Sequence, residues 1–251
     1  MFMRLVHVNV ENRMISEFHK AYNSEVIARL REMPGCRFAG LIESGSVETE
    51  FISLTLWDKQ EQAESYEKDG VYEQLLGKIR PYLSNTSEWK IQLSENLELQ
   101  YVPVTEDPVI KKYSVMAQGD TQSKSSIDSR LYVRIVSLAI QTGKEEEFRQ
   151  IYNNEIIPAL LSTRGCLYAY LTQSVQESNS FISVTIWDSK NDADLYESSG
   201  KFNELVDKVS HTFSQVYRWK MALENSYNAK VKTSEDMKIE KYNLVTGRNF
   251  Q

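Results

Sequence analysis

The sequence predicts an α+β protein built from two copies of one domain, and two observations support this. The composition is that of a globular protein, with 41% hydrophobic and 25% charged residues among 251. The chain also matches itself without a gap from Arg4 aligned with Arg134 to Leu93 aligned with Leu223. Within that match, FISLTLWD (51–58) meets FISVTIWD (181–188). A single long period of this kind indicates a duplicated domain rather than a solenoid, whose repeats are shorter and more numerous.

The duplication sets the expected domain boundaries. Repeat 1 is expected at residues 1–119 and repeat 2 at 131–247, with a polar, Ser-rich linker over 120–130. Both repeats continue beyond the gapless match, because Lys112-Tyr113 meets Lys241-Tyr242 once one residue is dropped. We expect these extensions, at about 98–117 and 227–245, to add one or two strands each. In one arrangement, the added strands cross over and pair with the neighbouring repeat.

Each repeat begins with a strand and a long helix. Val6, Val8 and Val10 alternate with polar residues, which is typical of a half-buried strand. Apolar residues at every fourth position from Phe18 to Leu30 then predict a helix, and Gly35 ends it. The same patterns recur in repeat 2 at Val136, Leu138 and Ile140, and then at Phe148, Tyr152, Ile156 and Leu160.

The remaining elements complete a β-α-β-β-α-β order. Residues 36–43 and 49–57 are expected to pair around a turn, residues 60–83 to form a helical region broken at Gly70, and residues 87–93 to form a fourth strand. This is the split βαβ, ferredoxin-like arrangement, with helices on one face of the sheet. Because the other face is apolar, we expect the two repeats to pack sheet to sheet as a pseudo-dimer within the chain.

Net charge, hydropathy and cysteine content limit the kinds of molecule that this protein is expected to bind and where it is expected to act. A net charge of -6 and a pI of about 5.3 argue against a nucleic-acid-binding surface and favour a small-molecule or protein partner, including further copies of the chain. No apolar run approaches the ~18 residues of a membrane span, so no membrane association is expected. Two cysteines and no signal-peptide pattern favour a reducing, cytoplasmic location. The histidines lack metal-ligand spacing, so no metal site is expected.

Two pairs of polar or aromatic residues suggest a pocket. Trp57 and Trp187 end an apolar strand, either as core residues or as walls of a substrate pocket. Asn23 and Asn153 fall inside the apolar arc of the first helix if it turns by ~100° per residue. A buried amide needs partners, so each asparagine either binds backbone or orients a ligand.

At this point the residues resemble a known family. Pro34-Gly35-Cys36, the strand ending Thr55-Leu56-Trp57-Asp58 and Ala63 look like the antibiotic biosynthesis monooxygenase (ABM) domain. In repeat 2 the corresponding features are Arg164-Gly165-Cys166, Thr185-Ile186-Trp187-Asp188 and Ala193. The resemblance implies a dimeric α+β barrel, with both halves in one chain. Its members include cofactor-independent oxygenases that make quinones, haem-degrading oxygenases and proteins without known activity.

The family's functional residues carry over in part. Quinone-forming members have an asparagine four residues before the tryptophan of the third strand and a tyrosine shortly after it. The tryptophan is kept here as Trp57 and Trp187, but Ser53 and Ser183 stand at the position of the asparagine. The tyrosine position falls near Glu64 and Asp194. In the haem-degrading pattern, Tyr66 and Tyr196 stand where those members have a tryptophan. The position of the histidine that binds the haem iron falls near Leu76 and Val206.

The resemblance therefore implies an oxygenase without a cofactor that acts on an aromatic or polycyclic substrate. Its pocket walls would include Asn23, Trp57 and Tyr66 in repeat 1 and Asn153, Trp187 and Tyr196 in repeat 2, beside Ser53 and Ser183. The alternative is a non-catalytic binding or sensing module, and a haem-degrading oxygenase is the third reading.

The repeats differ on their first two strands. His7 and Asn9 become Ser137 and Ala139. Phe38 and Gly40 become Tyr168 and Tyr170. Because these pairs differ in size and hydrogen bonding, we expect two chemically unequal pockets, with His7 and Asn9 lining the one in repeat 1. The space beside Gly40 is expected to make that cavity the roomier one, with one ligand per chain.

Overall fold

The computed structural model describes residues 1–93, 99–105, 108–120, 131–214 and 237–250, which form two compact units. The N-terminal unit contains Arg4–Lys111 and Val245–Gln251. The C-terminal unit contains Met1–Met3 and Lys112–Leu244. Both are α+β units with an antiparallel sheet, as the sequence predicts. No helix in the described ranges is long and apolar enough to cross a membrane.

In the sheet of the N-terminal unit, the third strand of the sequence lies between the first two. The strands are β1 (Phe2–Asn9), β2 (Cys36–Ser44) and β3 (Glu50–Trp57), in the order β1-β3-β2. The predicted hairpin is confirmed, because β2 and β3 pair antiparallel with Leu41 opposite Ser53. Beyond β2, the Phe250 amide donates to the Arg37 carbonyl at 2.7 Å.

Two helical segments cover one face of this sheet. The first runs without interruption through η1 (Asn12–Met14), α1 (Ile15–Ala21), the π-helical turn η2 (Tyr22–Ile27) and α2 (Ala28–Arg31). The second comprises α3 (Gln60–Lys68), α4 (Val71–Ile79) and η3 (Arg80–Tyr82). Gly70 separates α3 from α4 at φ +76°, a left-handed conformation that glycine adopts at little cost.

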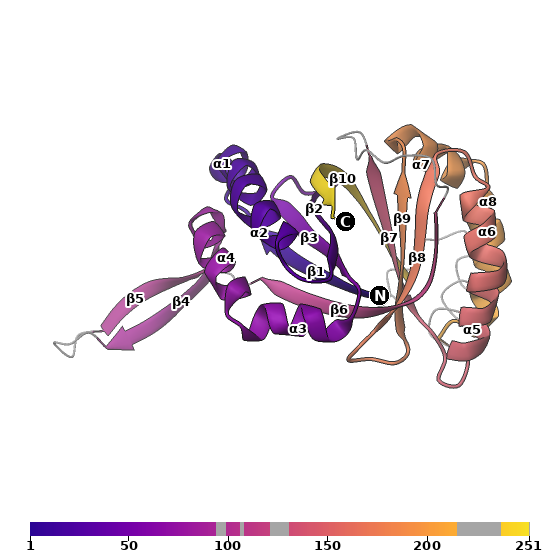
Figure 1. Cartoon of the computed structure of the whole chain (residues 1–251), viewed down its shortest axis with the longest axis horizontal. Helices are drawn as coiled ribbons and strands as arrows, with labels where there is room; N and C mark the ends of the chain where they lie inside the picture. The colour runs from indigo at the N-terminus through magenta and orange to yellow at the C-terminus, as the bar shows by residue number, and fades with distance from the viewer. Residues whose placement is uncertain (94–98, 106–107, 121–130, 215–236, 251) are drawn as a thin grey trace, which may run out of the picture. The chain divides into compact units, whose positions relative to one another are not determined.

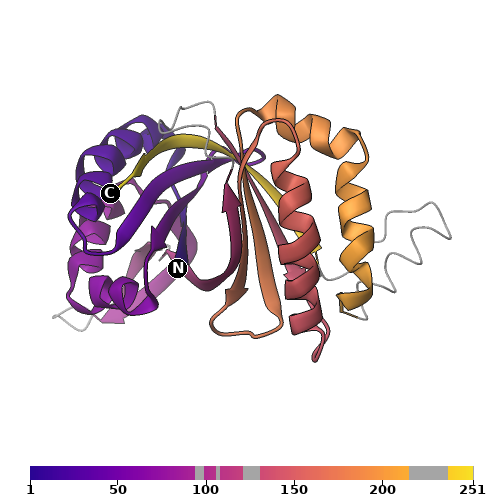
Figure 2. The ribbon, with the colours of Figure 1, turned by 45° about the vertical axis from the view of Figure 1, so that its right-hand side comes forward.

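The C-terminal unit repeats this plan. Strands β7 (Tyr132–Ala139), β8 (Cys166–Ser174) and β9 (Ser180–Trp187) follow the order β7-β9-β8. Figure 2 shows the helices lying along one face of these strands. They are α5 (Glu145–Ile151), the π-helical turn η4 (Tyr152–Ile156), α6 (Ile157–Leu161), α7 (Lys190–Ser198), α8 (Lys201–Val209) and η5 (Ser210–Thr212).

The extensions exchange between the repeats. Strand β6 (Val109–Asp120) ends repeat 1 in sequence, yet from Tyr113 onward it pairs with β8 in the C-terminal unit. Strand β10 (Met237–Asn249) ends repeat 2, pairs with β7 through Asn243 and passes into the N-terminal unit at Val245. Each folded unit therefore takes a strand segment from the other repeat's sequence, so neither unit is one continuous stretch of chain.

The predicted fourth strand has a different partner from the one expected. β4 (Asn85–Leu93) does form, but it pairs with β5 (Leu99–Thr105) as a separate two-stranded sheet (Figure 1). A partner only a few residues further along the chain is reached at a small entropic cost. In repeat 2 the corresponding strand, with most of the extension 227–245, lies outside the described residues, as does most of the linker 120–130.

Candidate functional site

Each unit contains a small cavity between its sheet and its helices. The cavity measures about 40 Å³ in the C-terminal unit and about 30 Å³ in the N-terminal unit. Equivalent residues line both, so the duplication extends to the cavities. These shared positions are Arg4 and Arg134, Tyr22 and Tyr152, Ser53 and Ser183, Tyr66 and Tyr196, and Tyr72 and Phe202. A space of 40 Å³ is comparable to that of one or two water molecules.

A buried arginine forms the polar wall of the C-terminal cavity. Arg134 lies on β7 in phase with Val136 and Leu138, which also line the cavity, and its side chain is 3% exposed. Its Nε donates to Glu197 Oε1 at 2.7 Å. Its guanidinium carbon lies 4.2 Å from the ring centroid of Phe202. An ion pair and a ring face thus fix the plane of the guanidinium.

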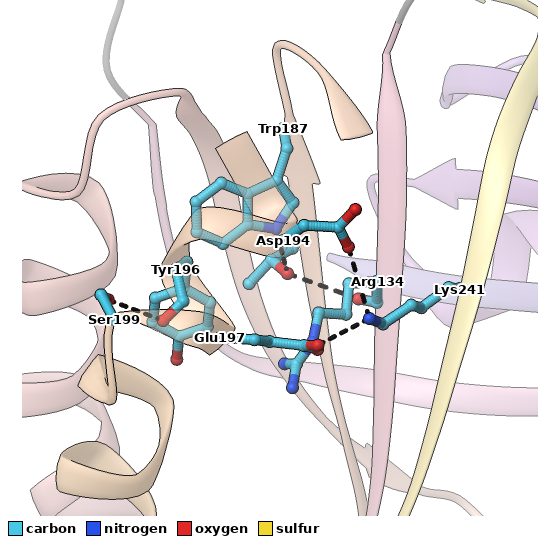
Figure 3. A network of polar contacts seen from close by, with 8 residues as sticks. Arg134, Trp187, Asp194, Tyr196, Glu197, Ser199 and Lys241 are labelled. Carbon is cyan, nitrogen blue, oxygen red and sulfur yellow. Dashed lines mark hydrogen bonds and ion pairs between the residues drawn. The ribbon is translucent and has the colours of Figure 1, made fainter. Parts of the chain in front are cut away.

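The carboxylate of Glu197 is shared between two cations (Figure 3). Lys241, which faces Arg134 across the β10–β7 ladder, donates to Glu197 Oε2 at 2.6 Å. The Lys241 ammonium also lies 3.5 Å from Asp194 Oδ1. Although partial burial acts in the opposite direction, hydrogen bonds from Lys241 and Arg134 hold the pKa of the Glu197 carboxyl below its ordinary value. Glu197 is therefore a weak base at neutral pH.

One donor of the guanidinium stays unused. The Nη2 atom of Arg134 is buried and has no hydrogen-bond partner in the part of the chain that the structure describes. The Nη2 atom of Arg4 is in the same state. A buried cationic donor without a partner costs free energy, so it calls for an explanation beyond folding.

Hydroxyl groups form the second polar feature. The Tyr152 hydroxyl and Ser183 Oγ are hydrogen-bonded, as are the Tyr22 hydroxyl and Ser53 Oγ at 2.7 Å. Burial raises the pKa of Tyr152 to about 12, against the opposing effect of its bond to Ser183. These tyrosines are neutral at physiological pH and can act as hydrogen-bond donors but not as bases.

The tryptophans stand one layer behind the cavities. The Trp187 indole donates to Thr185 Oγ1 at 2.9 Å, and its ring lies 5.0 Å from that of Tyr196. Trp57 is fully buried in the equivalent arrangement. Neither indole lines either of these two cavities. The indoles instead hold Thr185 and Tyr196, and their equivalents in the N-terminal unit, in place.

The prediction that Asn23 and Asn153 face the core is wrong, because both side chains are exposed. Asn23 Oδ1 accepts a hydrogen bond from Thr246 Oγ1 at 3.2 Å. The reason is the π-helical turn that contains each asparagine. Its i→i+5 bonding widens the turn and shifts the asparagine off the arc calculated for a regular α-helix. The nearby Glu25 pairs with Lys78 at the surface.

Phe38 occupies the space that the sequence predicts beside Gly40 in repeat 1. His7 and Asn9 alternate with Val6 and Val8, which line the N-terminal cavity, so their side chains lie on the opposite face of the sheet. On β2, the ring of Phe38 lies where a side chain at Gly40 would project, with its Cζ 2.8 Å from an added Cβ. Phe38 thus fills the volume that Gly40 leaves, and the two cavities described above are similar in size, at about 40 and 30 Å³.

The polar group that sequence reasoning missed is the arginine with its glutamate. Arg4 and Arg134 are identical between the repeats and occupy the apolar phase of an alternating strand. A charge in that phase must be buried and paired, so this signal was present in the sequence. Tyr66 and Tyr196, together with Ser53 and Ser183, line the two cavities.

The residues present do not fit a haem. The ligand position is occupied by Leu76 and Val206, which cannot coordinate iron, and the residues lining the two cavities include no histidine. His211 is exposed and pairs with Glu147. Among the described residues, no group of three His, Cys, Asp or Glu side chains could hold a metal ion.

Fold and cavity together define the class as an α+β domain with helices over one sheet face and a small, mostly apolar cavity between them. Residues 131–208 match the model of the antibiotic biosynthesis monooxygenase (ABM) family. The second repeat thus matches the ABM family model, and the family resemblance seen in the sequence is confirmed over these residues.

Solved structures share this fold along the whole chain. A provisionally assigned monooxygenase from Fusobacterium nucleatum matches with a TM-score of 0.69 at 10% identity, over 99% of this chain and 94% of its own. One from Lactobacillus acidophilus matches with a TM-score of 0.67 at 6% identity, over 99% and 95%. An anthrone oxidase-like protein matches with a TM-score of 0.58 at 11% identity, over 99% and 92%. No curated protein matches the chain. At these identities the likeness establishes the fold alone.

Proposed function

We propose that this protein is an ABM-type oxygenase that acts without a cofactor on a small aromatic substrate. The observation that carries the proposal is the cavity of the C-terminal unit, where apolar walls surround the buried Tyr152–Ser183 hydroxyl pair within an ABM domain. An electron-rich phenolate can reduce dioxygen directly. The protein would exclude water and donate a hydrogen bond to the oxyanion.

The reaction balances without an added reductant. In an anthrone, the ring CH₂ is oxidised to a carbonyl by one dioxygen molecule. One oxygen atom bonds to that carbon, and the other leaves as water with the two hydrogens lost from it. Because Glu197 is a weak base and Tyr152 has a pKa of about 12, the cavity offers no base suited to neutral pH. The substrate must therefore ionise readily by itself.

Substrate entry requires the cavity to widen. Ligand pockets typically enclose ~300–1,000 Å³, whereas this cavity measures about 40 Å³. Of the residues that α8 contributes to the wall, Phe202, Leu205 and Val206 are only partly buried, whereas Val209 is buried. Side chains with incomplete packing move at the lowest cost, so α8 is the wall that would yield to a substrate.

A non-catalytic binding module is the second candidate. It is favoured by Ser53 and Ser183, which stand at the position of the family's asparagine and are engaged with tyrosines, and by the lack of a suitable base. The two candidates differ in turnover and not in binding.

Oxygen uptake separates them. The purified chain is mixed with anthrone or a hydroquinone in an oxygen electrode, and quinone is followed by absorbance. We expect uptake above the rate of autoxidation, with a loss of most activity in Ser183→Ala and a smaller loss in the matched Ser53→Ala. Saturable binding without uptake above the background would support the binding module instead.

We also propose that the two sheets face each other as an intramolecular pseudo-dimer. The support is the exchange of β6 and the end of β10, each of which joins the unit built mainly from the other repeat. Each sheet is then incomplete without sequence from the other repeat.

A further inference from the structure

We propose that the C-terminal cavity contains an anion subsite at the guanidinium of Arg134, which takes the oxyanion of an aromatic acid or phenolate. The inference rests on the proposed function for the use of this site, but the binding it predicts is independent of turnover. It further assigns the subsite to the C-terminal repeat in preference to the N-terminal one.

The first argument is the unused donor. Arg134 is 3% exposed, and Nη2 finds no partner among the described residues although Nε is paired with Glu197. Among the residues that line the cavity, Arg134 is the charged one; Glu197 lies outside that lining. A ligand oxygen at Nη2 would replace a missing hydrogen bond with a charge-assisted one.

The second argument is preorganisation. Glu197 fixes one edge of the guanidinium, and the ring of the buried Tyr196, on α7, lies 5.7 Å from its central carbon. Lys241 holds Glu197 in turn. A donor that is fixed before binding loses little entropy when the anion arrives. The same apolar and aromatic walls suit the ring of an aromatic acid better than a hydrated inorganic ion.

The third argument is the difference between the two repeats. Arg4 lies 4.4 Å from the ring centroid of Tyr72, the counterpart of Phe202. Burial raises the pKa of Tyr72, and the positive charge of Arg4 and a hydrogen bond from it oppose that rise. Although Arg4 Nη2 itself has no partner among the described residues, the Tyr72 hydroxyl engages the Arg4 guanidinium through another nitrogen, and Phe202 offers Arg134 no such acceptor. The anion subsite should therefore be stronger at Arg134.

The test is titration calorimetry of the full chain with two probes, benzoate and 4-nitrophenolate, and with uncharged benzamide as the control ligand. We expect one site per chain for at least one anion and none for benzamide. Benzoate alone would identify a carboxylate subsite, and 4-nitrophenolate alone a phenolate subsite. Equal binding of benzamide, or two equal sites, would overturn the proposal.

Two conservative variants test the mechanism without removing the arginine. Phe202→Tyr supplies the missing acceptor and should weaken binding roughly tenfold or more. Tyr72→Phe removes the acceptor in the other repeat and should create a second site. Circular dichroism confirms folding of both. Binding unchanged in both variants would overturn the inference even if oxygen uptake is found, whereas anion binding without oxygen uptake would overturn only the proposed oxygenase.

Discussion

Arg134 and Lys241 face each other across the β7–β10 ladder, and each donates to one oxygen of the Glu197 carboxylate. Two cations at directly opposed positions would repel each other. The carboxylate of Glu197 offsets that repulsion by pairing with both cations, and Asp194 adds a second negative charge beside Lys241. Residues from two strands and a helix are thereby tied together next to the cavity.

The network predicts a stability change that depends on pH. Glu197→Gln should lower the free energy of unfolding by about 1–3 kcal/mol at pH 7, because it removes the charge that Arg134 and Lys241 share. The pKa of Glu197 lies below its ordinary value of 4.5, so its contribution is present above that pH and is lost as the pH falls through the lower, folded-state pKa.

Urea unfolding at several pH values measures this effect. The difference between wild type and Glu197→Gln should be largest near neutrality and should shrink on acidification. Glu204→Gln, on the neighbouring helix, serves as a surface control. A difference that stays constant from neutral to acidic pH would contradict the linkage.

The hydrogen bonds that the two tryptophan indoles donate to threonines predict that equivalent substitutions in the two repeats lower stability by similar amounts. Thr185→Val removes the acceptor of the Trp187 indole and leaves a buried N–H unpaired. Thr55→Val does the same for Trp57. Each substitution should cost about 1–3 kcal/mol. Thermal denaturation that shows no loss for either variant would mean that the indoles find other partners.

The two cysteines should be unreactive in the folded protein. Burial raises the pKa of the Cys166 thiol to about 12, and burial raises that of Cys36 to about 12 against its hydrogen bond to the Phe38 carbonyl. Because the thiolate is the reactive form, labelling by a disulfide reagent at pH 8 should be slow and should become fast for both thiols in urea. Rapid labelling of the native protein would show that one of these thiols is accessible.

The strand exchange predicts that repeat 1 is not viable alone. Residues 1–119 lack the segment from Val245 onward that adds to β2, and they retain β6, which pairs with β8 in the full chain. An unpaired strand edge and an uncovered sheet face favour self-association. We expect an insoluble or oligomeric product by size-exclusion chromatography with light scattering, whereas a stable monomer would rule out the pseudo-dimer.

Much of the fold follows from local signals in the sequence. The alternation of Val6, Val8 and Val10 and the left-handed break at Gly70 depend on residues close in sequence, so they could be predicted. The pairing of β4 with β5 instead of the main sheet could not, since it depends on which of several strands competes best for one edge.

The site was harder to predict because side-chain direction depends on details that a helical wheel does not contain. One π-helical turn is enough to move Asn23 from the apolar arc to the surface. In the same way, the space beside Gly40 depends on the rotamer of Phe38. Arg4 and Arg134, in contrast, were visible as charges in the apolar phase of a strand shared by both repeats.

The exchanged strands also bear on how the two copies could diverge. Each repeat encodes a strand segment that completes the unit formed mainly by the other, so neither copy can be deleted without damage to both. Selection for an intact fold therefore preserves both halves of the gene, whatever either cavity does. A difference such as Tyr72 in one copy against Phe202 in the other could then be tolerated, which gives a duplicated protein a route to two chemically distinct cavities.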